Sequence, residues 1–445
     1  MSLTDAGVTT ENAITAPDPT EAWSFETKQI HAGHTPDSTS NARALPIYQT
    51  TSYTFDSTAH AKALFSLEET GNVYSRIMNP TQDAIEQRIA ALEGGVAALL
   101  LASGQAAVAS AVLNLATSGD HVVTSPRLYG GSYTLFRHTL GRFGVAVTFI
   151  EDPDDLEQWR AAVRPNTKAF FGESISNPRN DVFDIEGVAS VAHEHGIPLL
   201  IDNTVATPYL IQPLRHGADI VVHSATKYLG GHGTTIAGVL VDGGTFDWAS
   251  GRFGNFTTPD PSYHGLVYAE LGPPAYAVKA RVSLLRDLGA AISPFSAFLL
   301  GQGIETLSLR VERHVQNAAA VAEFLTRRPE VASVAYAGLP TSPWYDRALA
   351  LSPRGAGAVV AFELAGGEKA ATTFIDALTL HSHVANIGDV RSLVLHPATT
   401  SHGQLSEAEQ LTAGVTPATV RLSVGLESIE DILADLRAGF DAVEQ

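Results

Sequence analysis

Short runs of Val, Ile, Leu and Ala recur between residues 97 and 241, at intervals of roughly 20–30 residues, and alternate with stretches of helical pattern. This interval is typical of repeated strand–helix units, which assemble into a mostly parallel sheet with flanking helices. The sequence therefore predicts an α/β fold. The predicted strands are Ala97–Leu101, His121–Ser125, Val145–Ile150, Lys168–Gly172, Pro198–Ile201, Asp219–Val222 and Val239–Val241.

The pattern also divides the chain into parts, and its length favours two domains. Residues 1–22 are rich in Thr, Ala, Asp and Pro without apolar periodicity, which predicts a disordered tail. The strand–helix units occupy 80–300, the predicted large domain, and end in a long loop rich in Gly, Pro and aromatic residues, Phe246–Pro274. The remainder, 301–445, starts with a helical stretch at Ser308–Thr326 and predicts a smaller C-terminal α/β domain.

The first helix of the large domain has clear start and stop signals. Asn79-Pro80-Thr81-Gln82 supplies an N-cap, a proline at the first helical position and a glutamine at N3. Ile85, Ile89 and Leu92 then recur on one helical face, and Gly94-Gly95 follows. We expect a helix that buries this apolar face.

Composition excludes several classes of function. A formal net charge of −19 argues against binding to nucleic acid or anionic membranes, because those ligands repel an acidic surface. No apolar run reaches the length of a transmembrane helix, and the N-terminus does not resemble a secretory signal. The absence of cysteine excludes disulfides, thiolate metal sites and cysteine nucleophiles. We therefore expect a cytoplasmic protein that acts on small molecules.

Three chemically informative segments follow predicted strands. Ser103-Gly104-Gln105 opens a helix of small residues and forms an anion cradle, because backbone N–H groups and the helix dipole point at the junction. Asp202-Asn203-Thr204 supplies a carboxylate that can pair with a cation. Ser224-Ala225-Thr226-Lys227 supplies an amine and two hydroxyls. Ligands bind outside the carboxyl ends of such strands, so we expect the three segments to meet.

Each segment has a plainer interpretation, namely a turn, a helix N-cap or a solvated lysine. Competing motifs are absent, since Lys227 does not follow a phosphate-loop pattern and Gly355-Ala356-Gly357 lacks the third glycine of a dinucleotide fingerprint. His223 and His232 have no metal-binding pattern around them, so we predict no metal site and interpret both as ordinary polar residues. An anion cradle, a carboxylate and an amine at one sheet edge together favour pyridoxal phosphate, whose phosphate, ring nitrogen and aldehyde need these three partners.

The chain also resembles the Cys/Met-metabolism family of fold-type-I pyridoxal phosphate enzymes, from about residue 24 to the C-terminus. Within that family it is similar to the sulfhydrylase branch. The motifs that carry this resemblance are Tyr74-Ser75-Arg76, Ala102-Ser103-Gly104-Gln105-Ala106, Leu128-Tyr129-Gly130-Gly131, Ser176-Asn177-Pro178, Asp202-Asn203-Thr204, HSATKYLGGHG at 223–233, ANIGDVRSLVLHPATTSH at 385–402 and VRLSVGLE at 420–427.

The resemblance implies a role for each matching residue. Lys227 is expected to form the Schiff base with the cofactor, Asp202 to pair with the pyridine nitrogen, and Tyr129 to stack on the ring and assist proton transfer. The implied phosphate ligands in the same subunit are Gly104, Gln105, Ser224 and Thr226. Tyr74 and Arg76, from an N-terminal arm at 23–79, are expected to reach the phosphate of a neighbouring subunit, which implies a homodimer at least and a homotetramer as in the family.

The resemblance further implies that Arg421 holds the substrate carboxylate, helped by Asn177 and Asn386. The strand pattern alone favours a surface arginine at position 421, because alternation places Arg421 and Ser423 on one face, and the motif match reverses this preference. Bidentate binding of a carboxylate suits arginine. The role of His232 stays open.

The activity implied is γ-replacement, in which O-acetylhomoserine and sulfide give homocysteine and acetate, or methanethiol gives methionine. Gly131 stands where methionine γ-lyases commonly carry a cysteine, and Phe246–Pro274 resembles the corresponding segment of the sulfhydrylases. The alternatives are cystathionine γ-synthase or γ-lyase, an O-succinylhomoserine sulfhydrylase and, more remotely, a non-catalytic scaffold. The presence of Lys227, Asp202 and Arg421 argues against a non-catalytic scaffold.

Overall fold

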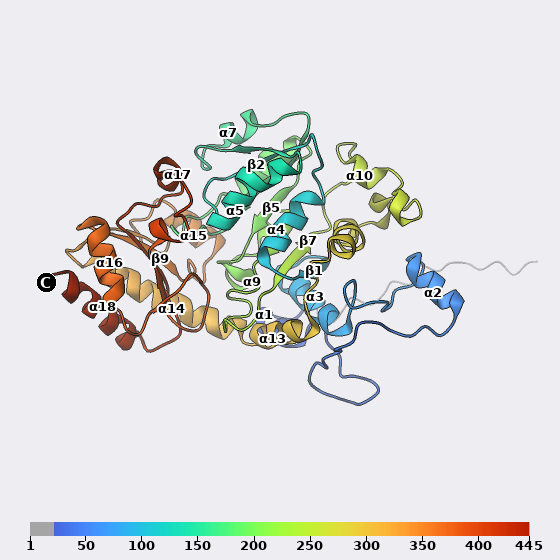
Figure 1. The fold of residues 1–445 in the computed structure, drawn as a ribbon, viewed down its shortest axis with the longest axis horizontal. Helices are drawn as coiled ribbons and strands as arrows, with labels where there is room; N and C mark the ends of the chain where they lie inside the picture. The colour runs from blue at the N-terminus through green and yellow to red at the C-terminus, as the bar shows by residue number, and fades with distance from the viewer. Residues whose placement is uncertain (1–21, 445) are drawn as a thin grey trace, which may run out of the picture.

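The larger part of the protein is built on a seven-stranded sheet (Figure 1). This is a computed structural model that describes residues 22–444, so the tail predicted at 1–22 lies, apart from residue 22, outside the described residues. Its strands, in spatial order, are β1 (Ala97–Leu101), β7 (Gly238–Asp242), β6 (Ile220–His223), β5 (Leu199–Asp202), β4 (Thr167–Glu173), β2 (His121–Thr124) and β3 (Ala146–Phe149).

The predicted strands are confirmed, each within one residue at either end. From β6 to β3 the strands run parallel, whereas β7 is antiparallel to both of its neighbours, β1 and β6. The α/β fold with a mostly parallel sheet is therefore confirmed. Because the strands are buried on both faces, they read in the sequence as continuous apolar runs.

Alternate residues of the strands, apart from the edge strand β3, belong to two separate hydrophobic clusters. In β5, Leu199 and Ile201 belong to one hydrophobic cluster and Leu200 to the other. Helices therefore cover both faces of the sheet (Figure 1). They are α3 (Pro80–Glu93), α4 (Gly104–Leu113), α5 (Gly130–Thr134) continued by η1 (Leu135–Thr139) and α6 (Leu140–Arg142), α7 (Leu156–Ala161), α8 (Ile185–Glu194), α9 (Thr207–Leu210), η2 (Pro213–His216), α11 (Ala275–Lys279) continued by η5 (Ala280–Leu285) and α12 (Arg286–Leu288), and α13 (Pro294–Ile304).

Helix α3 follows its predicted signals with one exception. The Asn79 side chain accepts a hydrogen bond from the Thr81 N–H, Pro80 occupies the first turn, and Gly94 ends the helix in the left-handed conformation. The predicted face is fully buried. Gln82, expected to close a capping box, instead donates to the Ile292 carbonyl at 2.7 Å, because α3 is packed against α13 and that carbonyl lies within reach.

The segment predicted as a loop at Phe246–Pro274 contains helical turns, which corrects that expectation. These are α10 (Gly254–Thr257), η3 (Pro261–Tyr263) and η4 (Tyr268–Leu271). Trp248 stacks on Phe256 with 4.6 Å between ring centroids, and the buried Lys279 ammonium lies 4.9 Å from the Phe256 ring. Aromatic stacking orders a segment whose glycines and prolines indicate a loop.

The C-terminal part forms a second, five-stranded sheet. Its strands, in spatial order, are β10 (Ser382–His383), β11 (Leu393–Leu395), β12 (Thr419–Ser423), β9 (Val359–Leu364) and β8 (Val331–Ala335), antiparallel except for the β10–β11 pair. The helical elements are α14 (Leu307–Thr326), α15 (Tyr345–Leu351), α16 (Gly367–Ala377), η6 (Pro397–Thr399), α17 (Glu407–Thr412) and α18 (Ile429–Val443). Helices α14 and α16 pack against β8, β9 and β12, and α18 packs against these two helices, which closes the core of this part.

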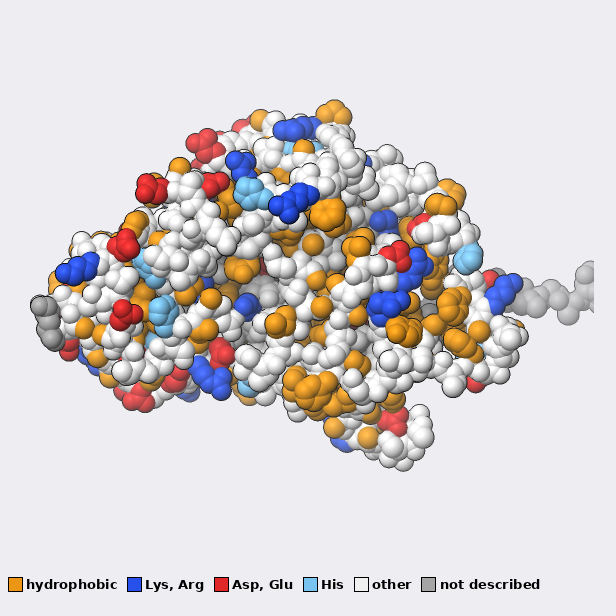
Figure 2. Space-filling view, in the orientation of Figure 1, with side chains coloured by type: hydrophobic (Ala, Val, Ile, Leu, Met, Phe, Trp, Pro, Cys, Tyr) orange, Lys and Arg blue, Asp and Glu red, His pale blue; other side chains and the backbone are white. Residues whose placement is uncertain are grey.

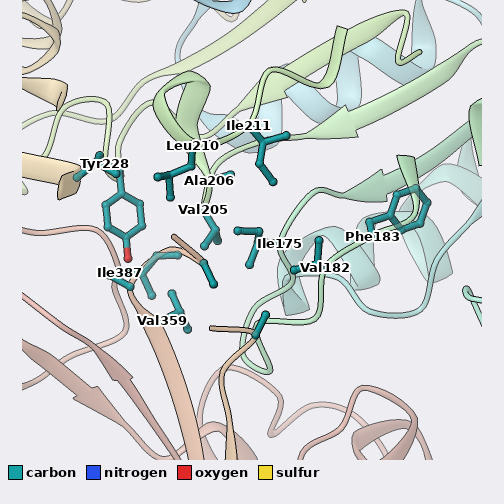
Figure 3. Close-up of a cluster of buried hydrophobic side chains, with 14 of the residues drawn as sticks. Ile175, Val182, Phe183, Val205, Ala206, Leu210, Ile211, Tyr228, Val359 and Ile387 are labelled. Carbon is teal, nitrogen blue, oxygen red and sulfur yellow. The ribbon is translucent and has the colours of Figure 1, made fainter. Parts of the chain in front are cut away.

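One hydrophobic cluster joins the two sheets. Figure 3 shows Ile175 and Val205, from the large sheet's loops, facing Val359 and Ile387 of the C-terminal part, with Tyr228 beside them. Burial of these side chains holds the two parts together next to the site described below. Helix α1 (Phe25–His31) packs against α3 and α14 in the body, whereas the segment with α2 (Thr58–Phe65) projects at the right of Figure 1.

Among residues 22–444, no helix combines the length and apolar character needed to cross a membrane.

Candidate active site

A cavity of about 550 Å³ opens where the carboxyl ends of β4, β5 and β6 face the C-terminal sheet. Ten of the twelve predicted site residues line it. These are Gly104, Gln105, Tyr129, Asn177, Asp202, Ser224, Thr226, Lys227, Asn386 and Arg421. The cavity thus brings together the three segments that the sequence placed at the sheet edge, and it adds residues from the C-terminal part.

Lys227 lies on a tight turn directly after β6. Its N–H donates to the Ser224 carbonyl at 3.1 Å, and the Gly231 N–H donates back to the Lys227 carbonyl at 2.7 Å. The buried Arg310 guanidinium binds the Tyr228 carbonyl at 2.7 Å and also caps the end of the turn. A side chain at Gly231 would overlap Arg310, and φ at Gly231 is +72°, so this position needs glycine.

The Lys227 amine has one hydrogen-bond partner, a side-chain amide, and lies in a poorly polar environment. Its Nζ donates to Asn386 Oδ1 at 2.5 Å. Burial, with the Arg421 charge as a second cause, lowers the pKa of Lys227 from 10.5 to about 8. Gly388, at φ +71°, brings the 385–388 segment against the backbone N–H of Tyr228 and so places Asn386 beside the amine. The lowered pKa increases the fraction of Lys227 that is neutral, and therefore nucleophilic, near neutral pH.

The anion cradle is formed at the N-terminus of α4. Ser103 caps the helix by accepting from the Ala106 N–H at 3.1 Å, and the Gly104 and Gln105 amides are at the open end. A Cβ on Gly104 would lie 2.5 Å from Ser224 Cβ, so only glycine allows the helix and the lysine turn to meet. Gln105 also accepts from the Ser132 hydroxyl at 3.3 Å.

The two hydroxyls of the lysine turn are used differently. No described residue hydrogen-bonds to the Ser224 hydroxyl, which faces the cavity. The Thr226 hydroxyl donates to the Ala237 carbonyl at 3.1 Å and accepts from the Ala237 N–H at 3.0 Å. Thr226 therefore connects the turn to the residue before β7. Its hydroxyl oxygen lines the cavity, but its proton is already donated to the Ala237 carbonyl.

Asp202 ends β5 and points into the cavity. Its Oδ1 accepts from the Thr204 N–H at 2.9 Å and from the Thr204 hydroxyl at 2.5 Å, while no described residue hydrogen-bonds to Oδ2. Burial raises the pKa of this carboxyl, and the Thr204 hydrogen bonds and the charge of His223 oppose the rise. Asp202 is thus a carboxylate with one oxygen available to a buried cation.

Arg421 is buried, with 4% of its surface exposed, which excludes the surface-arginine interpretation. Its Nη2 donates to the Asn386 carbonyl at 2.9 Å and Nη1 contacts Asn177 Oδ1 at 3.4 Å. The buried Nε has no partner among the described residues. Burial lowers the pKa of the guanidinium to about 10, which leaves it cationic at neutral pH. An unpaired buried donor beside a cavity is suited to binding a carboxylate.

The Tyr129 ring stands free at the cavity, 46% exposed, while its backbone is anchored. The Tyr129 N–H donates to Glu173 Oε1 at 2.6 Å. A Cβ on Gly131 would lie 2.5 Å from the ring edge, so the glycine leaves room for the ring. Glu173, at the end of β4, is a site residue that sequence reasoning missed, although its position beside Asp202 at a strand end was a usable signal.

Tyr74 and Arg76 do not line the cavity of their own chain. Both are exposed, and the Arg76 guanidinium lies 5.0 Å from the Tyr74 ring. His223 is buried against Glu93 Oε1 at 2.5 Å, and His232 is exposed with its Nδ1 2.7 Å from the Gly230 carbonyl. Within 22–444 no group of histidine and acidic residues could hold a metal.

The residues present fit pyridoxal phosphate. The helix N-terminus that a Cβ at Gly104 would obstruct suits a phosphate. The open Oδ2 of Asp202 suits a protonated ring nitrogen, and the depressed pKa of Lys227 suits covalent attachment to an aldehyde. All three lie around one cavity of sufficient volume.

Comparison with known proteins gives the same answer. A sequence profile described as Cys/Met metabolism PLP-dependent enzyme matches residues 26–441. The chain belongs to this family. It is a pyridoxal-phosphate-dependent enzyme, and its similarity to solved fold-type-I structures agrees with the fold above.

Several family members are similar over nearly their whole length. An O-acetyl-L-homoserine sulfhydrylase of Corynebacterium glutamicum is 57% identical over 428 residues, covering 95% of this chain and 98% of the relative. One of Thermus thermophilus is 51% identical over 415 residues, covering 93% and 99%. A solved O-acetylhomoserine (thiol)-lyase structure from Campylobacter jejuni, with N′-pyridoxyl-lysine-5′-monophosphate, superposes with TM-score 0.92 at 42% identity, covering 95% and 100%.

Proposed function

We propose that this enzyme catalyses γ-replacement on O-acetyl-L-homoserine, with sulfide giving L-homocysteine and acetate, as a step of methionine biosynthesis. Methanethiol in place of sulfide gives methionine. The observation that carries the proposal is the cavity itself, in which a buried amine of lowered pKa faces a buried arginine with an unpaired donor. The names of relatives that are 51–57% identical support the same reaction.

Arg421 is the proposed anchor for the substrate α-carboxylate. Its Nε has no partner among the described residues, and its Nη1 bond to Asn177 is long at 3.4 Å, so both can turn to an incoming carboxylate. The Nη2 bond to the Asn386 carbonyl fixes the guanidinium plane. Asn177 offers an amide to the same carboxylate.

Bound pyridoxal phosphate supplies an electron sink that stabilises negative charge at Cα and Cβ of the substrate. Gly104, Gln105 and Ser224 would hold its phosphate, and Asp202 its ring nitrogen, whose proton the carboxylate keeps in place. Tyr129 would lie against its ring. Lys227 would take the Cα proton of the substrate and later return protons to the product, and its pKa of about 8 suits both directions.

The cations of the cavity favour the acetyl donor. Among the described lining residues only Lys227 and Arg421 are cationic, and both have assigned partners. A neutral acetyl group needs no third cation, whereas a succinyl group carries an additional carboxylate into a partly buried space. An uncompensated buried charge is costly, so the acetyl ester is the better substrate.

The proposed enzyme is a homodimer at least, with a homotetramer as the larger assembly. Tyr74 and Arg76 are exposed away from their own cavity, on an arm that projects from the body. The arm also exposes Phe55 and Phe65, and Figure 2 shows hydrophobic side chains gathered over α2 and over α13. A second subunit that covers the arm would bury this surface and receive Arg76 at its phosphate site. A cytoplasmic location follows from the biosynthetic substrate and is part of the proposal.

The test is a panel of substrates on the purified holoenzyme. O-acetyl-, O-succinyl- and O-phosphohomoserine are each combined with sulfide, methanethiol and cysteine. We expect the highest kcat/KM for O-acetylhomoserine with sulfide. Equal or higher values for the succinyl ester would refute the donor, and faster turnover with cysteine would indicate a cystathionine synthase instead.

A further inference from the structure

A second buried carboxyl group lies beside the one expected to face the cofactor. Glu173 ends β4 and pairs in register with Asp202, which ends the neighbouring strand β5. Their exposed fractions are 6% and 8%, and both line the cavity. Residues in register on adjacent parallel strands project from the same face of the sheet. The two carboxyl groups are therefore neighbours in a poorly solvated place.

Two adjacent buried carboxylates repel each other, so the pair binds a proton more readily than either carboxylate would alone. Asp202 is the better anion, because it accepts two hydrogen bonds from Thr204 and is close to His223. Burial and the Asp202 charge raise the pKa of Glu173 well above its usual range, with the backbone N–H groups of Tyr129 and Asn177 opposing the rise. The proton therefore belongs to Glu173.

No cation of the described chain pairs with Glu173. Arg421 and Lys227 both hydrogen-bond to Asn386, and Arg127 forms its ion pairs with Asp152, Asp154 and Asp181. The charged side chains around this strand end are Asp202, Lys227 and Arg421 in the cavity, and Arg127, Asp154 and Asp181 at a small void behind it.

The same carboxyl group fixes the backbone of the cavity wall. The Tyr129 N–H donates to Glu173 Oε1 at 2.6 Å, and the Asn177 N–H is close enough to act on it. The Glu173 side chain thus links the backbone of Tyr129 to the backbone of Asn177, and the Asn177 side chain contacts Arg421. A carboxylic acid can serve here, because its carbonyl oxygen still accepts a hydrogen bond.

We propose that Glu173 is a positioning residue that works as a neutral acid: it anchors the Tyr129 backbone and carries the proton of the carboxyl pair, so that the negative charge stays on Asp202. The role given to Asp202 rests on the proposed function. The pairing and the anchor concern the polypeptide alone and are testable in the apoprotein.

The first measurement is infrared difference spectroscopy of the apoprotein at pH 7, wild type minus Glu173→Gln. We expect the carbonyl band of one protonated carboxylic acid in the wild type, and its loss in the variant. In Asp202→Asn the repulsion is gone, so the band of Glu173 should disappear at lower pH than in the wild type. Subtraction removes the contribution of the other buried carboxyl groups.

The second measurement compares Glu173→Gln with Glu173→Ala in the holoenzyme. Glutamine keeps an oxygen that accepts from Tyr129 and is neutral, so we expect kcat within about threefold of the wild type and a pH profile unchanged in shape. Alanine removes the anchor, and we expect kcat to fall at least tenfold, with thermal unfolding of both variants reported alongside.

Either a wild-type apoprotein without the acid band, or a glutamine variant as impaired as the alanine variant, overturns the proposal. Failure of O-acetylhomoserine as a substrate leaves the apoprotein spectrum untouched and would count only against the proposed reaction. If Glu173→Ala does not fold, the spectrum and the glutamine variant still decide.

Discussion

Gly104→Ala tests whether the N-terminus of α4 is the phosphate cradle. The added Cβ would lie 2.5 Å from Ser224 Cβ and 2.8 Å from Ser224 Cα. Carbon atoms are in favourable contact at about 3.5–4.0 Å, so the helix and the lysine turn must separate by roughly 1 Å. Both are well packed, since Gly104 is buried and the turn is clamped by Arg310. Relief by a simple side-chain rotation is therefore not available.

The separation has two consequences of different size. Overpacking of this kind costs about 1–3 kcal/mol of unfolding free energy in the apoprotein. Moving the Gly104 and Gln105 amides away from Ser224 also spoils at least one hydrogen bond to a charged group, worth about 1.5–3 kcal/mol. We therefore expect the dissociation constant for pyridoxal phosphate to rise about ten- to a hundredfold.

The assay is titration of apoprotein with pyridoxal phosphate, followed by absorbance, together with thermal unfolding. The matched control is Gly141→Ala in α6, where an added Cβ meets no atom within 4 Å. The control should bind the cofactor as the wild type does and be no less stable, since alanine favours helix. A Gly104→Ala protein with the affinity and melting temperature of the control would refute the cradle.

Three further outcomes are expected. In Arg421→Gln the rate at which apoprotein takes up pyridoxal phosphate should rise at higher pH than in the wild type, because Arg421 helps to lower the pKa of Lys227 to about 8 and its removal favours the ammonium; an unshifted pH profile would contradict this. Gly131→Ala should displace the Tyr129 ring and lower kcat about tenfold with little change in melting temperature, and a crystal structure with an unmoved ring would count against the reasoning. Lys227→Ala and Arg76→Ala subunits, inactive alone, should regain activity as hybrids, and inactive hybrids shown to form would exclude a shared site.

The sequence predicted best what depends on neighbouring residues along the chain. Apolar runs and their spacing located the strands, and strand ends located Ser103, Asp202 and Lys227, because parallel strands bring their carboxyl ends to one edge. It failed where distant segments decide the outcome. Gln82 leaves its expected cap for a carbonyl more than two hundred residues away. The burial of Arg421 could not be read from an alternation that a surface strand shares.

Asn386 shows why the chemistry of this site needs both sheets. Its side-chain oxygen accepts from Lys227 Nζ, and its backbone carbonyl accepts from Arg421 Nη2. The amine and the proposed carboxylate anchor are thus held by one residue, on a segment that Gly388 packs against the lysine turn. Because burial by that segment and the Arg421 charge both lower the pKa of Lys227, any shift of 385–388 away from the large sheet would raise it and loosen Arg421 together.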